Sequence, residues 1–129
     1  MSSKDTNLKM TPEQYAKRLW DWTPLNGCFD RGIRVGDLDG FVEVGNKFLV
    51  IEGKPPGGEL PKGQGYALTR LAKMDNFTVV VLEGTPPFDI VGWRVLGKKK
   101  YVGGAEEFKK FIRKWFEYAD AKGGEDDQT

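Results

Sequence analysis

The feature that most limits the possible folds is the nearly continuous apolar run FTVVVLE over residues 77–83, which follows a segment with helical spacing. Runs of this kind mark a central strand that is buried on both faces. A strand reached through a helix can pair parallel, whereas strands joined by a tight turn pair antiparallel. The pattern therefore predicts an α/β fold, a three-layer α-β-α sandwich with a central mixed β-sheet.

Other patterns supply the rest of this sandwich. A first helix is expected to begin at Thr11, as its N-cap, with Pro12 in its first turn and Leu19 and Trp22 at helical spacing. The other expected elements are strands at 28–35, 38–44, 47–52 and 77–83, helices at 63–75 and 105–121, and an outer hairpin of 89–96 with 99–102. We expect residues 1–10 to form a flexible arm, 11–121 a single domain and 122–129 a disordered tail.

Composition removes several classes of chemistry. The chain of 129 residues contains no histidine and one cysteine, Cys28, which excludes histidine-based catalysis, histidine-ligated zinc and an internal disulfide. Its 20 basic and 19 acidic residues give a net charge of +1, so a nucleic-acid ligand would need a local basic patch. No signal peptide or membrane-spanning run is visible, and we expect a cytoplasmic protein.

A pair of acids lies across a predicted hairpin. Gly45 and Asn46 separate two β-rich runs, which is a strong hairpin pattern. In one register the hairpin places Asp39 opposite Glu52, and directly opposed residues have Cβ atoms roughly 4.5–5.5 Å apart. Two carboxylates at that distance repel unless a cation lies between them. Because Mg²⁺ prefers a few carboxylates plus water, the hairpin predicts a magnesium site.

A lysine completes this constellation. Glu52 and Lys54 are two residues apart on a strand, so they project to the same face of the sheet. Lys54 would then lie beside the metal, where its ammonium could orient a water molecule or stabilise charge developing on a phosphate. Chemistry of this kind needs no histidine.

An Asp, a β-hairpin and a Glu-x-Lys in this order resemble the PD-(D/E)xK nuclease superfamily. Gly36-x-x-Asp39 resembles the G-x-x-D of its RecB-like members, and Gln64 with Leu68 resembles the glutamine motif of RecB-like and VRR-NUC nucleases. The resemblance spans residues 13–83. The small size of the chain and the string RGIRVGDLDGF resemble phage-encoded members of the superfamily. The resemblance implies a restriction endonuclease-like core of order α-β-β-β-α-β, although the proline of the signature is missing and Leu68 stands where tyrosine is often found.

The resemblance also implies roles for particular residues. In such nucleases the positions of Asp39 and Glu52 bind metal, that of Lys54 activates water and that of Gln64 positions substrate or water. Two further acids are candidate metal ligands, namely Glu13 on the first helix and Asp37, which competes with Asp39. Four basic residues flank the expected site and could contact phosphates: Arg31, Arg34, Lys62 and Arg70.

We therefore expect a Mg²⁺-dependent deoxyribonuclease, with Mn²⁺ as a substitute, that takes part in phage or prokaryotic DNA processing. Its partner would be DNA, and a small domain of this kind could act as a homodimer or in a larger DNA-processing complex. Two alternatives stay open. One is a catalytically silent module of the same fold that binds nucleic acid or a replication or packaging partner, and the other is an unrelated α/β interaction protein.

Overall fold

The computed structural model describes residues 11–17 and 19–127, and it divides the chain into two compact units, Met1–Gly36 and Asp37–Thr129. Each unit is described by itself. The expected flexible arm of residues 1–10 lies outside the described residues. That the two units together form one domain stays a prediction.

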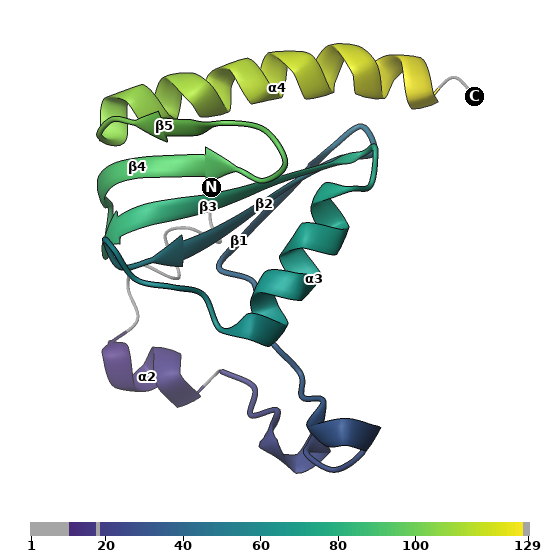
Figure 1. Cartoon of the computed structure of the whole chain (residues 1–129), viewed down its shortest axis with the longest axis vertical. Helices are drawn as coiled ribbons and strands as arrows, with labels where there is room; N and C mark the ends of the chain where they lie inside the picture. The colour runs from purple at the N-terminus through teal and green to yellow at the C-terminus, as the bar shows by residue number, and fades with distance from the viewer. Residues whose placement is uncertain (1–10, 18, 128–129) are drawn as a thin grey trace. The chain divides into compact units, whose positions relative to one another are not determined.

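The first unit contains one short helix, α2 (Pro12–Lys17), among its described residues (Figure 1). Thr11 caps it as predicted, because the Gln14 backbone N–H donates to Thr11 Oγ1 at 3.0 Å and the Thr11 N–H donates to Gln14 Oε1 at 3.0 Å. The prediction that this helix carries Leu19 and Trp22 was wrong. Its last residue is Lys17, and a 3₁₀ turn at Thr23–Leu25 follows.

The strand predicted at residues 28–35 is absent. A 3₁₀ turn occupies Asp30–Gly32, and Arg31 and Gly32 both have positive φ, at 63° and 69°. A strand needs φ well below zero, so two left-handed residues in the middle of the run prevent pairing. Of the three consecutive strands expected here, the structure forms the second and third.

The second unit is built on a five-stranded sheet of order β1-β2-β3-β4-β5 (Figure 1). The strands are β1 (Gly40–Val44), β2 (Lys47–Lys54), β3 (Phe77–Thr85), β4 (Asp89–Val95) and β5 (Lys100–Val102). β2 and β3 are parallel, and the other neighbouring pairs are antiparallel. The predicted mixed sheet is therefore confirmed, with the central strand and the outer hairpin within two residues of their expected bounds.

The predicted hairpin register is also confirmed. Val42 pairs with Leu49 and Val44 with Lys47. The turn residues Gly45 and Asn46 have φ of 52° and 70°, which suits a two-residue hairpin turn. This turn fixes the register of every residue that follows along β1 and β2.

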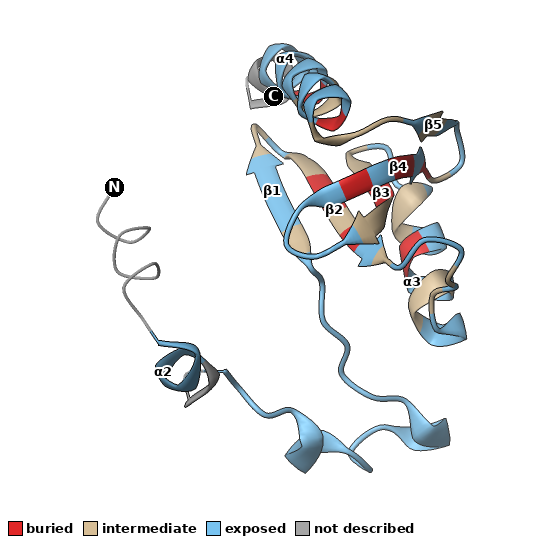
Figure 2. Ribbon diagram, turned by 90° about the vertical axis from the view of Figure 1, so that its left-hand side faces the viewer, coloured by how far each residue is buried: buried red, intermediate tan, exposed pale blue. Residues whose placement is uncertain are grey.

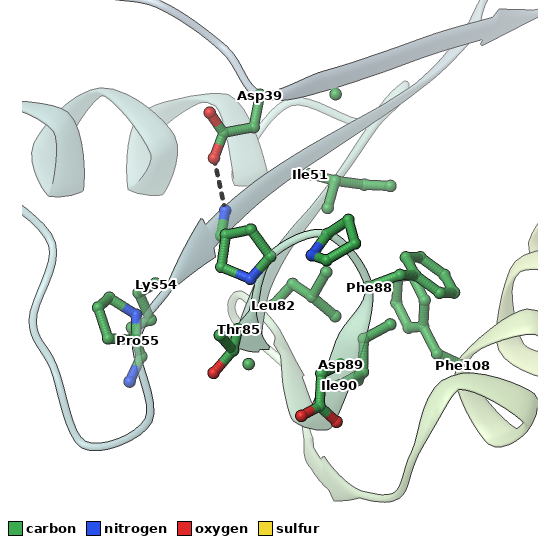
Figure 3. A pocket seen from close by; sticks show the side chains of 15 residues that line it. Asp39, Ile51, Lys54, Pro55, Leu82, Thr85, Phe88, Asp89, Ile90 and Phe108 are labelled. Atoms are coloured by element: carbon green, nitrogen blue, oxygen red, sulfur yellow. Dashed lines mark hydrogen bonds between the residues drawn. The ribbon is translucent and has the colours of Figure 1, made fainter. Parts of the chain in front are cut away.

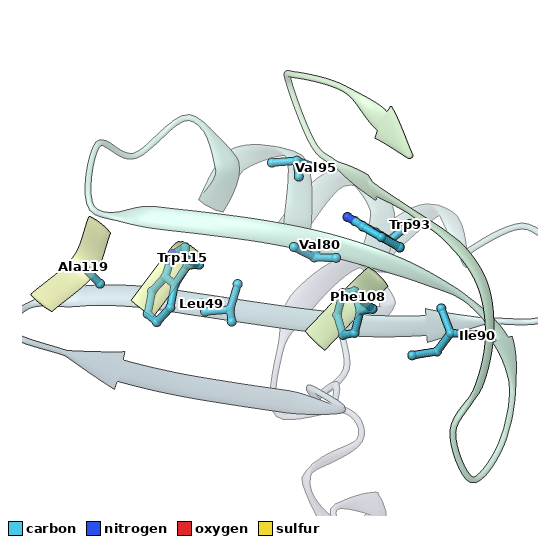
Figure 4. Close-up of a cluster of buried hydrophobic side chains, with 8 residues drawn as sticks. All are labelled: Leu49, Val80, Ile90, Trp93, Val95, Phe108, Trp115 and Ala119. Atoms are coloured by element: carbon cyan, nitrogen blue, oxygen red, sulfur yellow. The ribbon is translucent and has the colours of Figure 1, made fainter. Parts of the chain in front are cut away.

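Two helices cover opposite faces of the sheet: α3 (Lys62–Ala72) and α4 (Ala105–Asp127). Adjacent strand residues point to opposite faces, and Val50 packs with Leu68 of α3 whereas Leu49 packs with Trp115 of α4 (Figure 4). In Figure 2 the buried residues lie in the sheet and on the helix sides that face it. The second unit is a mixed α/β fold, with α4 continuing past the expected end at residue 121.

Among the described residues, no helix is both long enough and apolar enough to cross a membrane.

Candidate functional site

Asp39 and Glu52 come together at one end of the hairpin. The β1–β2 ladder ends with the pair of Gly40 and Ile51, so Asp39 and Glu52 follow one position beyond it, and the Asp39 carboxyl lies close enough to shift the pKa of Glu52. The Asp39 carboxylate is held in place because its Oδ2 accepts a hydrogen bond from the Gly53 backbone N–H at 2.9 Å. The turn at residues 45–46 thus delivers the acid pair that the sequence pattern predicted.

The Glu52 carboxyl is buried and lies beside the carboxyl of Asp39. The residue is 5% exposed, and its Oε2 atom has no hydrogen-bond partner among the described residues. Burial raises the pKa of Glu52, and the neighbouring Asp39 carboxyl raises the pKa further. A buried carboxylate beside a second carboxylate is costly to ionise unless a cation joins them.

Gln64 lies at the same place. It stands in the first turn of α3, and its side chain lies close enough to the Glu52 carboxyl that hydrogen bonding to it opposes the rise of the Glu52 pKa. One helical turn later, Leu68 is 1% exposed and packs on Val50 and Val79, which anchors α3 to the sheet. The structure therefore brings together Asp39 from just before β1, Glu52 from β2 and Gln64 from α3.

Lys54 follows Glu52 on the same strand face, but its ammonium contacts other groups. Lys54 Nζ lies 2.8 Å from Glu83 Oε2 and donates to the Gly58 carbonyl oxygen at 2.8 Å. Glu83 is its register partner on β3 and also accepts from the Gly57 N–H at 2.9 Å. The hydrogen bond from Lys54 lowers the pKa of Glu83 most, and the hydrogen bond from Gly57 lowers it further.

Glu83 is a site residue that sequence analysis missed. Its only sequence signal is its position at the end of the apolar run 77–83. The parallel register of β2 and β3 places it beside Lys54. The loop that follows Lys54 is tied to the same carboxylate through Gly57.

The remaining predicted residues are exposed. Asp37 is exposed and takes no part in the Gly53 hydrogen bond or in the pKa shift of Glu52. Lys62 and Arg70 lie exposed on α3. Glu13, Arg31 and Arg34 belong to the first unit, and their part in the site stays a prediction.

A cavity of about 600 Å³ opens beside Asp39 (Figure 3). It lies where the parallel strands β2 and β3 end, and ligands of α/β proteins commonly bind beyond the carboxyl ends of such strands. Polar groups line part of it, namely Asp39, Lys54, Thr85 and Asp89. The cavity and the acid pair therefore share Asp39.

The donor set fits a small hard cation. Among the described residues, no group of three or more Asp, Glu, Cys or His side chains is positioned to hold a metal, and the acid pair itself offers two carboxyl groups. Mg²⁺ commonly takes one or two carboxylates and keeps several waters. The free Oε2 of Glu52 is an oxygen ligand without a partner, as such a site requires.

No protein-family model, curated protein or solved structure matches this chain.

Proposed function

We propose that this chain is a Mg²⁺-dependent nuclease that hydrolyses phosphodiester bonds in DNA. The observation that carries the proposal is the buried Glu52 carboxylate, which has an unpartnered Oε2 and lies beside Asp39. A purely structural acid would be expected to find a cation or donors for all its buried oxygens. Asp39 and Glu52 would hold the metal.

When bound, Mg²⁺ would lower the pKa of water and neutralise charge on the phosphate. The protein's part is to fix the two acids and to supply a positive charge. The Gln64 side chain opposes the rise of the Glu52 pKa and so favours the ionised form of that carboxyl. Lys54 extends from the same strand face and could contact a phosphate or a water molecule, provided that it exchanges its contact with Glu83.

The proposal includes a restriction endonuclease-like core. The consecutive elements β1, β2, α3 and β3 match the β-β-α-β part of the expected order, with an antiparallel hairpin followed by a parallel strand. Of the residues proposed to bind metal or activate water, Asp39 directly precedes β1, and Glu52 and Lys54 lie on β2. Arg31, Arg34, Lys62 and Arg70 would supply the local positive charge for DNA that the net charge of +1 does not.

A cleavage assay tests this proposal. Supercoiled plasmid and labelled linear, flap and single-stranded oligonucleotides would be incubated with the full chain in Mg²⁺, Mn²⁺ or EDTA. We expect metal-dependent cleavage that is lost in Asp39→Ala and in Lys54→Ala. Asp75→Ala is a matched control, because this exposed acid lies just before β3, at the other end of the β2–β3 pair. Cleavage that persists in EDTA and in both site variants would refute the mechanism.

One observation favours a second candidate, a catalytically silent module that binds nucleic acid. Lys54 is held by both Glu83 and Gly58 at 2.8 Å, away from the acid pair. If this contact is permanent, the lysine is a structural residue. DNA binding without cleavage in any divalent metal, unchanged by Lys54→Ala, would support the silent module.

A further inference from the structure

The cavity beside Asp39 has apolar walls. Ile51 of β2, Leu82 of β3 and Ile90 of β4 line one side. The chain between β3 and β4 lines another with Pro86, Pro87 and Phe88. Gly84 makes this arrangement possible, because a Cβ atom there would overlap the Asp89 carbonyl oxygen. The strand ends can therefore approach closely and enclose the space.

An exposed aromatic ring lies at this cavity. Phe88 is 47% exposed, and its ring centroid lies 6.4 Å from that of Phe108, which is 3% exposed. Phe108 belongs to α4 and is fixed in the core between this helix and the sheet, so it supports Phe88 from the protein side (Figure 3). Aromatic side chains that keep one face open are platforms on which nucleobases stack.

The size of the cavity and the polar groups that line it indicate which class of ligand it can bind. A volume of about 600 Å³ falls within the range of roughly 300–1,000 Å³ that is typical of small-molecule sites. Asp39, Lys54, Thr85 and Asp89 add acceptors and donors to the apolar walls. A flat heteroaromatic ring with hydrogen-bonding edges matches this combination better than an aliphatic side chain of a partner protein does.

We propose that this cavity binds an unpaired nucleobase, so that the substrate is a nucleic-acid strand with at least one unpaired nucleotide at the cleavage position. The inference rests on the proposed nuclease function, since Asp39 belongs both to the cavity and to the acid pair. Asp39 and Phe88 line the same cavity, so a base seated against Phe88 would occupy the space that Asp39 borders. A base inside a duplex is stacked between its neighbours and cannot enter unless it leaves the helix.

Fluorescence of 2-aminopurine tests the proposal without cleavage. A single-stranded oligonucleotide with one 2-aminopurine and its duplex counterpart would be titrated with the full chain in Ca²⁺, a hard cation with the same preference for oxygen ligands. We expect quenching with the single strand and much less with the duplex. Phe88→Ala should weaken single-strand binding roughly tenfold, whereas Phe88→Tyr, which keeps the ring, should bind like the wild type.

Phe41→Ala is the matched control, because Phe41 is a similarly exposed aromatic, at 55%, on β1, and it does not line the cavity. Circular dichroism melts would establish that Phe88→Ala is folded. Equal affinity of Phe88→Ala and the wild type for the single strand would overturn the proposal, as would equal losses for single strand and duplex.

Cleavage of matched oligonucleotides with and without a base at one position separates the two claims. Cleavage that requires Asp39 but has the same rate without the base and in Phe88→Ala would overturn the base pocket. It would still support the proposed nuclease. Ring-dependent quenching with no cleavage in any metal would instead support the pocket and refute the nuclease.

Discussion

Replacement of Glu52 by glutamine is expected to stabilise the metal-free protein at pH 7 and to remove most of its stabilisation by Mg²⁺. Glu52 is 5% exposed, and burial and then Asp39 raise its pKa above the ordinary 4.5. The folded state therefore binds the proton more tightly than the unfolded chain does. In the absence of metal, stability should fall as the pH rises from about 4.5 through the raised pKa, and then stay at the lower level. Glutamine keeps the shape without the charge.

The expected size of the metal effect follows from ligand linkage. At a free Mg²⁺ concentration ten times Kd, binding to the native state contributes about 1.4 kcal/mol. The second unit, Asp37–Thr129, has the size of domains of roughly 60–100 residues. For such domains, that free energy corresponds to a Tm increase of about 6–11 °C. If Glu52→Gln weakens Kd tenfold, the same Mg²⁺ concentration contributes about 0.4 kcal/mol, or about 2–3 °C.

Thermal melts followed by circular dichroism would measure both effects, with ionic strength matched by NaCl in the metal-free samples. Asp75→Asn is the control, since it removes an exposed acid and should leave the Mg²⁺ shift unchanged. The reasoning would be refuted if Glu52→Gln retained the full Mg²⁺ shift, or if it were less stable than the wild type at pH 7 without metal.

Three further predictions concern the supports of the site. Leu49→Ala removes a fully buried side chain from the core under α4 and should lower the free energy of unfolding by about 2–5 kcal/mol, measured by urea denaturation. Gln64→Ala removes a group that opposes the rise of the Glu52 pKa, so protons should compete better with Mg²⁺ for that carboxyl. The Mg²⁺ affinity measured by calorimetry across the titration of Glu52 should therefore fall, and an unchanged affinity would count against the role of Gln64. Because the pKa of Glu83 is lowered, its contact with Lys54 contributes stability above a pH of about 4.5, and this contribution is lost as the pH falls through the lowered value. An NMR titration of the Glu83 carboxyl should give this low pKa, and Lys54→Met should raise it toward the ordinary range, with the Gly57 N–H still lowering it in part.

The second unit could be predicted from sequence where local chemistry decides the structure. Gly45 and Asn46 tolerate positive φ, which fixes a two-residue turn and with it the register that brings Asp39 to Glu52. The apolar run 77–83 needs cover on both faces, and α3 and α4 supply it. Both inferences require only the periodicity of strands and the backbone preferences of two residues.

The rest depends on contacts that the sequence does not encode locally. Residues 28–35 have strand-like composition, but the positive φ of Arg31 is a backbone choice that few non-glycine residues make. The pairing of Lys54 with Glu83 requires the parallel register of β2 and β3, which a 22-residue connection does not fix by itself. The cavity likewise needs the close approach of Gly84 to Asp89, which only the folded chain reveals.

The central claim is that Asp39 and Glu52 share one divalent cation. Anomalous diffraction from crystals of the full chain soaked in Mn²⁺ tests it most directly. We expect one anomalous peak within ligand distance of both carboxylates, and its loss in crystals of Glu52→Gln. A map without a peak between these two acids at millimolar Mn²⁺, or a peak that persists in the variant, would contradict the account.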